Sequence, residues 1–73
     1  MLIDGRGMSP PEPLERTLAA LATIAADEEL VLLLYCQPHP LYKLLRAEGH
    51  VWQEQLLEDG TREIRIRRAR PAP

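Results

Sequence analysis

The feature that most constrains the fold is an apolar run at residues 29–36, Glu-Leu-Val-Leu-Leu-Leu-Tyr-Cys, the only long run of this kind in the sequence. Acidic residues precede it, and residues 37–40, Gln-Pro-His-Pro, follow it. A short apolar run between such breaks is typical of a central strand that is buried on much of both faces. The other elements therefore have to pack around this strand. Its carboxyl end, at Cys36, is where open α/β sheets commonly place a site.

The length of the chain limits what it can build. Its 73 residues are predicted to form a single domain over residues 1–68, followed by a disordered tail at residues 69–73. A domain of this size buries only about 60% of the surface that its unfolded chain exposes. One cysteine excludes an internal disulfide, and neither a signal peptide nor a membrane span is recognisable. A reducing, cytoplasmic setting is the resulting expectation.

A proline-rich segment is predicted to start the first helix. Residues 9–13, Ser-Pro-Pro-Glu-Pro, precede leucines and alanines at helical spacing, which predicts a helix that ends near residue 25 or 26. Two residues are possible as the N-cap of this helix. Ser9 would form a capping box with Glu12, whereas Pro10 is slightly preferred because the following prolines then occupy positions that need no N–H. With either cap, prolines remove amide donors and Glu12 adds negative charge, so phosphate binding is not expected at this helix start.

A second helix is predicted after residues 38–40, Pro-His-Pro. Leu41, Leu44 and Leu45 recur at helical spacing, which favours a core-facing stripe over a ligand pocket. Gly49 is a natural left-handed stop for this helix.

The carboxyl-terminal part of the chain is predicted to form a β-hairpin. Residues 58–60, Glu-Asp-Gly, are a turn signal between two segments with strand patterns. In the second strand Ile64 and Ile66 share one face. In the first strand of the hairpin the pattern does not decide which residues face the core. They are either His50, Trp52 and Leu56, or Val51 and Leu57. With a short strand at residues 2–4, the prediction is an α/β (α+β) two-layer sandwich of order β-α-β-α-β-β, with a mixed four-stranded sheet and two helices on one face.

One face of such a sheet lies open. Two apolar sets alternate along the central run, namely Val31, Leu33 and Tyr35, and Leu30, Leu32 and Leu34. Whichever set points away from the helices forms an apolar strip that needs a cover. We therefore expect a partner protein, or self-association, at the open sheet face.

Residues 3–14, Ile-Asp-Gly-Arg-Gly-Met-Ser-Pro-Pro-Glu-Pro-Leu, and the order of elements resemble the TusA-like (SirA-like) sulfurtransferase superfamily. Its members begin with a strand, a glycine-containing turn and a Cys-Pro-x-Pro element that opens the first helix. Residues 11–13 match the Pro-x-Pro part, whereas Pro10 stands in the position of the persulfide-carrying cysteine. The resemblance covers about residues 2–67 and implies the fold. Because proline cannot carry sulfur, Pro10 weighs against the family's enzymatic activity.

Residues 37–45, Gln-Pro-His-Pro-Leu-Tyr-Lys-Leu-Leu, followed by Glu48 and Gly49, carry a second resemblance. They are similar to a branch of the superfamily known mainly as a domain of unknown function, which has a Pro-Leu-Tyr-x-x-Leu motif and lacks the helix-start cysteine. Members of this branch are sometimes joined to hemerythrin-like domains. The branch brings no established chemistry.

Local chemistry is predicted at Cys36 and His39. Their spacing across a turn would allow a thiolate–imidazolium pair, which lowers the pKa of a thiol and makes it nucleophilic. The alternative is that Cys36 is simply packed. Cys36, His39 and His50 are also considered as metal ligands, and His39 with Tyr35 or Tyr42 as ligands of heme or iron. A lone Cys-x-x-His is short of the four ligands of structural zinc, so neither a metal nor a cofactor is predicted.

The resemblance and the local chemistry together predict a non-enzymatic binding or accessory module in sulfur or redox metabolism. The alternative is a sulfur carrier or thiol redox protein that uses Cys36, activated by His39. The predicted binding surface lies around the two helix starts and comprises Pro11, Glu12, Pro13, Pro38, Pro40 and Tyr42. Arginines cluster in the last twelve positions, but no aromatic residue is interleaved with them, so nucleic-acid binding is not favoured.

Overall fold

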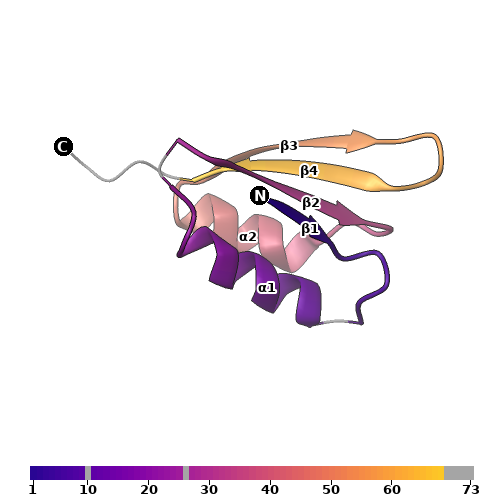
Figure 1. Ribbon diagram of the computed structural model, residues 1–73, viewed down its shortest axis with the longest axis horizontal. Helices are drawn as coiled ribbons and strands as arrows, with labels where there is room; N and C mark the ends of the chain where they lie inside the picture. The colour runs from indigo at the N-terminus through magenta and orange to yellow at the C-terminus, as the bar shows by residue number, and fades with distance from the viewer. Residues whose placement is uncertain (10, 26, 69–73) are drawn as a thin grey trace.

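The computed structural model describes residues 1–9, 11–25 and 27–68, which form a mixed four-stranded sheet covered on one face by two helices (Figure 1). In chain order the elements are β1 (Leu2–Asp4), α1 (Glu12–Leu21), β2 (Glu29–Leu34), α2 (His39–Ala47), β3 (Val51–Leu56) and β4 (Arg62–Arg67). The strands lie in the order β1-β2-β4-β3; β1 is parallel to β2, and the other neighbours are antiparallel. The predicted order of elements and the two-layer arrangement are confirmed. The predicted tail at residues 69–73 lies outside the described residues.

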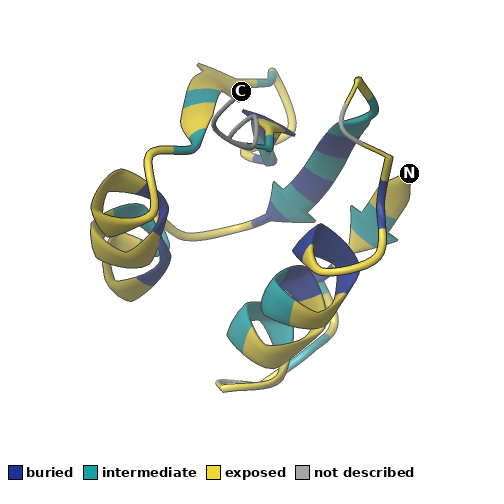
Figure 2. Cartoon of the chain, turned by 90° about the vertical axis from the view of Figure 1, so that its left-hand side faces the viewer, coloured by how far each residue is buried: buried dark blue, intermediate teal, exposed yellow. Residues whose placement is uncertain are grey.

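The core is built on one face of β2. Leu30, Leu32 and Leu34 point to the helices and are almost fully buried, opposite Ile66 and Ile64 of β4. Buried residues alternate along β2 and lie on the inner sides of both helices (Figure 2). The predicted shared face of Ile64 and Ile66 is therefore confirmed, with both side chains 0% exposed.

The start of α1 differs from the prediction by one residue. Its cap is Pro11, rather than Pro10, which lies outside the described residues, or the alternative Ser9. The Glu12 N–H donates to the Ser9 carbonyl over 3.0 Å, so a backbone turn satisfies this donor without a side-chain cap. Pro13 takes the second helical position, where no intrahelical N–H is needed.

The end of α1 comes earlier than predicted. The helix stops at Leu21, so the expected end near residue 25 or 26 is wrong. The N–H groups of Thr23 and Ile24 both donate to the Ala20 carbonyl over 3.0 Å, and the Thr23 hydroxyl donates to the same oxygen. These competing bonds tighten the chain into a turn, which brings Ile24 into the core.

Helix α2 follows the prediction except at Leu44. Leu41 and Leu45 are buried, and Gly49 has the expected positive φ of 79°. Leu44 is 37% exposed, so its assignment to the core is wrong. Leu41 and Leu45, with Tyr42 packed beside them, form the narrow stripe by which α2 meets the core.

Strand β3 lies at an edge of the sheet and is mostly exposed. Trp52 pairs with Ile66 and Glu54 with Ile64, so the even-numbered residues share the helix side of the sheet. Trp52 packs against the core, whereas Val51 and Leu56 are 61% and 60% exposed. Neither of the two sets of residues that the sequence offered for the inward face of this strand is buried as a whole, because an edge strand has a neighbouring strand on one side only.

The open face of the sheet is more polar than expected. Val31 and Leu33 are half-buried there, because their register places Arg65 and Glu63 of β4 beside them. Arg65 forms ion pairs of 2.8 Å with both Glu29 and Glu63. The apolar strip therefore borders a ladder of charges and is narrower than the sequence pattern suggests.

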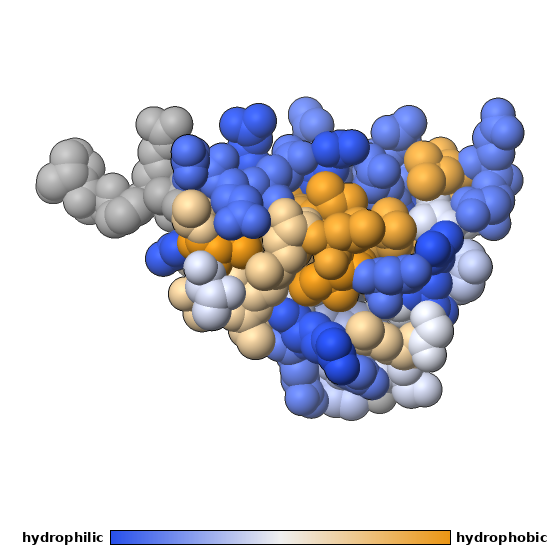
Figure 3. All heavy atoms as spheres, viewed as in Figure 1, coloured by the Kyte–Doolittle hydropathy of each residue, from blue (hydrophilic) through white to orange (hydrophobic). Residues whose placement is uncertain are grey.

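Apolar side chains also gather around β1 in the view of Figure 1 (Figure 3). Met1 and Leu2 at this edge are 52% and 62% exposed. None of the described helices is long and apolar enough to cross a membrane.

Candidate functional site

A cavity of about 330 Å³ opens where the parallel strands β1 and β2 end and both helices begin. Its wall comes from the loop after β1, from the first residues of α1 and α2, and from the end of β2 with the turn that follows it. The lining residues are Gly5, Arg6, Met8, Pro11, Pro13, Leu14, Leu34, Tyr35, Cys36, Gln37, Pro38, Pro40 and Leu41. Because most of these side chains are apolar, the cavity suits an apolar group.

Gly5 allows the loop after β1 to lie tightly against the end of β2. Its N–H donates to the Leu33 carbonyl over 2.8 Å, which extends the parallel ladder by one bond. A Cβ at this position would lie 2.7 Å from Leu34 Cδ2, 3.2 Å from the Leu33 oxygen and 3.5 Å from Pro13 Cβ. The close approach therefore needs glycine, and it draws the loop, β2 and α1 together on one side of the cavity.

Proline occupies the same two positions in both helix starts. Pro11 and Pro38 are the caps, and Pro13 and Pro40 are the second helical residues. All four line the cavity. Since proline carries no N–H, these helix starts present rings where other helices present amide donors. The wall is apolar for this reason.

The remaining two residues of the predicted binding surface lie elsewhere. Glu12 forms an ion pair of 3.1 Å with Arg16 on α1. The Tyr42 ring stacks on Trp52 with centroids 5.3 Å apart. Neither residue is among those that line the cavity.

Cys36 and His39 lie near each other in sequence but have different surroundings. Cys36 is exposed and lines the cavity. His39 is the first residue of α2, and its ring packs edge-on against Tyr42 at a centroid distance of 6.2 Å. Within the described residues no hydrogen bond joins the Cys36 thiol to the His39 ring. The His39 ring lies against Tyr42 in the next turn of α2, and the predicted thiolate–imidazolium pair stays a prediction.

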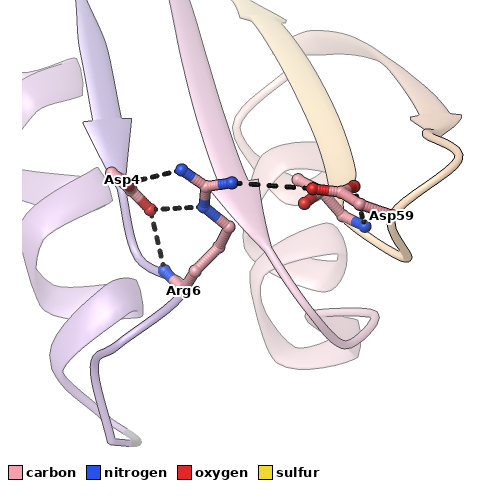
Figure 4. A network of polar contacts seen from close by, with 4 residues as sticks. Asp4, Arg6 and Asp59 are labelled. Atoms are coloured by element: carbon pink, nitrogen blue, oxygen red, sulfur yellow. Dashed lines mark hydrogen bonds and ion pairs between the residues drawn. The ribbon is translucent and has the colours of Figure 1, made fainter.

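A charged network borders the cavity at Arg6 (Figure 4). Arg6 donates from Nε and Nη2 to the two oxygens of Asp4 over 2.9 and 2.8 Å, and its backbone N–H donates to Asp4 Oδ1. Its Nη1 lies 3.9 Å from Asp59 Oδ2 in the β3–β4 turn. The hydrogen bonds from the Arg6 side chain lower the pKa of Asp4 to about 2, and those to Asp4 raise the pKa of Arg6. Two carboxylates thus neutralise the cation at the rim.

Sequence reasoning did not single out this network. Asp4 and Arg6 are close enough in sequence for a local turn contact, which is a usable signal. The sequence indicates Asp59 only as a turn residue, and nothing local connects it with Arg6. The contact exists because the β3–β4 turn and the loop after β1 lie at the same end of the sheet (Figure 4).

A second cluster holds α2 against β3. Arg46 lies over the Trp52 ring at 6.0 Å, on the residue that stacks with Tyr42. Glu54 accepts hydrogen bonds from Arg62 over 2.8 Å and from Gln37 over 3.3 Å. Burial, and then the nearby Glu54 carboxylate, raise the pKa of Tyr42 to about 12. Because Gln37 also lines the cavity, this cluster steadies the turn that carries Cys36.

The residues considered as metal ligands are not gathered in one place. His50 lies beyond the carboxyl end of α2, with Nε2 3.0 Å from Glu48 Oε2, whereas His39 begins that helix. In the part of the chain that the structure describes, no group of three or more His, Cys, Asp and Glu side chains could hold a metal ion.

The element order and the sheet topology define a small two-layer protein of the SirA/TusA-like class. A SirA-like protein from Desulfitobacterium hafniense has a similar crystal structure, with a TM-score of 0.79 and 25% identity over 89% of this chain and 92% of that one. The chain belongs to the DUF2249 family of uncharacterized conserved proteins, whose model matches residues 2–68. This confirms the predicted superfamily. No curated protein matches the chain.

Proposed function

We propose that this protein is a non-enzymatic accessory module in sulfur or redox metabolism, which binds an apolar segment of a partner protein in the cavity between the helix starts. The observation that carries the proposal is the proline-lined wall of this 330 Å³ cavity. Its connection with sulfur metabolism comes from the resemblance to TusA-like sulfurtransferases. The SirA-like structural neighbour supports the membership of this superfamily.

The chemistry of the wall favours binding over catalysis. Removing apolar surface from water in it is favourable by about 25 cal/mol per Å², from which the costs of association are subtracted. The cavity volume of about 330 Å³ lies at the lower end of the range for ligand sites, so it suits one or two side chains of a partner. The cation at its rim, Arg6, is already neutralised by Asp4 and Asp59. Apolar contact is therefore the main source of affinity.

The binding proposal is tested by titrating the isotope-labelled protein with a cysteine desulfurase and following amide chemical shifts. We expect the shifts to change mainly at the lining residues that carry an N–H, such as Gly5, Met8 and Cys36, because the four prolines have no amide proton. Met8→Glu places a charge in the wall and should weaken binding at least about tenfold, the equivalent of 1.4 kcal/mol. Ser9→Glu adds the same charge to the next residue, which does not line the cavity, and should bind normally. Shift changes confined to another surface would contradict the assignment.

A second candidate function is a sulfur carrier or thiol redox protein, favoured by the exposed Cys36 thiol on the cavity wall. In the sulfur-carrier reaction the Cys36 thiolate attacks the outer sulfur of a donor persulfide. A new S–S bond forms at Cys36, the donor S–S bond breaks, and the donor leaves as a thiolate. Since His39 makes no bond to the thiol, this reaction would depend on Cys36 without help from that ring.

Intact mass after treatment with a cysteine desulfurase and cysteine separates the two candidates. A carrier gains one sulfur atom, loses it to reductant, and gains none as Cys36→Ser. His39→Ala should load as well as the parent protein. If the reduced protein gains no sulfur and Cys36 also reacts slowly with alkylating reagents, the carrier function is contradicted, whereas the binding function is unaffected.

A further inference from the structure

The outer edge of β3 is long and only weakly protected. The strand runs for six residues, Val51–Leu56, at one edge of the sheet, whereas the opposite edge strand, β1, has three. Proteins commonly protect such edges with proline, with charged side chains, especially lysine, or with a short strand; β3 has neither proline nor lysine, and Glu54 is its only charged residue. Its residues are mostly exposed, including the apolar Val51 and Leu56. The edge therefore offers a template for another strand.

The register of the β3–β4 hairpin determines which backbone N–H and C=O groups point outward on this free edge. The Leu57 N–H donates to the Thr61 carbonyl over 2.8 Å, and the same register continues along the ladder of β3 with β4. Because bonded residues alternate in an antiparallel ladder, residues 51, 53 and 55 bond to β4. The N–H and C=O groups of Trp52, Glu54 and Leu56 consequently point outward, where an added strand can reach them.

We infer that β3 pairs with β3 of a second copy, antiparallel and centred on Gln53. Two identical antiparallel strands obey a two-fold axis, so one residue must face its own counterpart. A register centred on Glu54 would set two carboxylates opposite each other, which is destabilising. A register centred on Gln53 pairs two neutral amides and places Glu54 opposite Trp52 of the second copy. About four backbone hydrogen bonds then form across the axis.

The charges near the edge fit this register. Arg46 lies over the Trp52 ring at 6.0 Å and forms no ion pair among the described residues. In the centred register Glu54 of one copy, which keeps its ion pair of 2.8 Å with Arg62, approaches Arg46 of the other, so each Arg46 guanidinium gains a carboxylate neighbour. The shared surface is one strand edge, well below the roughly 1,200 Å² of stable complexes, so the dimer is weak and reversible.

A disulfide trap tests both the pairing and its register. In a Cys36→Ser background, Gln53→Cys places two thiols across the axis at a non-hydrogen-bonded pair, where Cα atoms lie about 4.5 Å apart. That separation is within the range of disulfides. Gln55→Cys is the matched control on the same exposed face, and its counterpart lies about 13 Å along the strands. We expect mild oxidation to give covalent dimers from the first variant and not from the second.

A charge variant tests the same pairing without crosslinking. Gln53→Lys sets two ammonium groups opposite each other and should raise the dimer dissociation constant about fivefold in sedimentation equilibrium. Gln55→Lys carries the same charge opposite Val51 and should have a smaller effect. Equal crosslinking of the two cysteine variants would overturn the register. A monomeric mass at millimolar concentration, with no covalent dimer from Gln53→Cys, would overturn the proposal and leave the edge to a strand of another protein.

Discussion

At Gly5 the chain has no room for a side chain. The glycine lies where the loop after β1 meets the end of β2 and the start of α1, and an added Cβ would touch both Leu34 and the Leu33 carbonyl. Gly7, two residues later, has nothing within 4 Å of the same hypothetical atom. Two glycines that look equivalent in the sequence thus have different roles.

Gly5→Ala should lower the free energy of unfolding by about 1–3 kcal/mol, the usual effect of overpacking. The Leu34 side chain can move, but the Leu33 carbonyl belongs to the sheet and cannot move freely. Gly7→Ala is the control and should change the free energy by less than about 0.5 kcal/mol. Urea denaturation measures both. Similar values for the two variants would show that the close approach at Gly5 is not a constraint.

At the scale of elements, β2 organises the molecule, because β1 and β4 both pair with it and both helices pack on one of its faces. Leu32 is 0% exposed on the helix side, whereas Leu33 is half-buried on the open side. The two faces of the strand therefore contribute unequally to stability. An alternating pattern of this kind is hidden in the sequence, where both positions are leucine.

Leu32→Ala should destabilise the fold by about 2–5 kcal/mol, because it leaves a cavity in the core. Leu33→Ala removes the same atoms from the open face and should cost about 1 kcal/mol. Thermal or urea unfolding of the pair gives the comparison. The reverse order would mean that the open face, rather than the helix side, is the better-packed surface in solution.

At the scale of the whole molecule, polar contacts join distant parts of the chain at both ends of the sheet. At the cavity end Arg6 connects Asp4 with Asp59 of the hairpin. At the other end the Arg68 guanidinium donates to the Ile24 carbonyl over 2.7 Å. These contacts add stability to a small domain in which few side chains are buried.

Acid should weaken the ion pair at the cavity end. The pKa of Asp4 falls from 3.8 to about 2 on folding, because Arg6 binds the carboxylate. A depressed pKa contributes stability above the unfolded value, and this contribution is lost as the pH falls from about 4 to about 2. Asp4→Asn should therefore flatten the loss of stability in that window. Arg6→Gln should raise the pKa of Asp4, because it removes the guanidinium that binds the carboxylate. Asp4 resonances that titrate near 3.8 in the native protein would contradict this effect of Arg6 on Asp4.

Much of the fold was predictable because its signals are local. The apolar run at residues 29–36, the prolines before each helix and the residue 58–60 turn each restrict the backbone where they occur. The Ile64 and Ile66 alternation assigned one face of β4 directly. The end of α1 and the exposure of Leu44 were missed, since bonds to the Ala20 carbonyl and the small size of the core overrode the helical pattern.

The candidate site was only partly predictable. The sequence by itself determined the order of elements and the proline-rich helix starts, because backbone preferences and hydrophobic periodicity act over a few residues. Only the tertiary structure brought Gly5, Cys36 and the four prolines into one cavity, placed the His39 ring against Tyr42, and set Asp59 beside Arg6. These contacts join residues far apart in the chain or depend on where a helix begins, and packing of the two layers decides both.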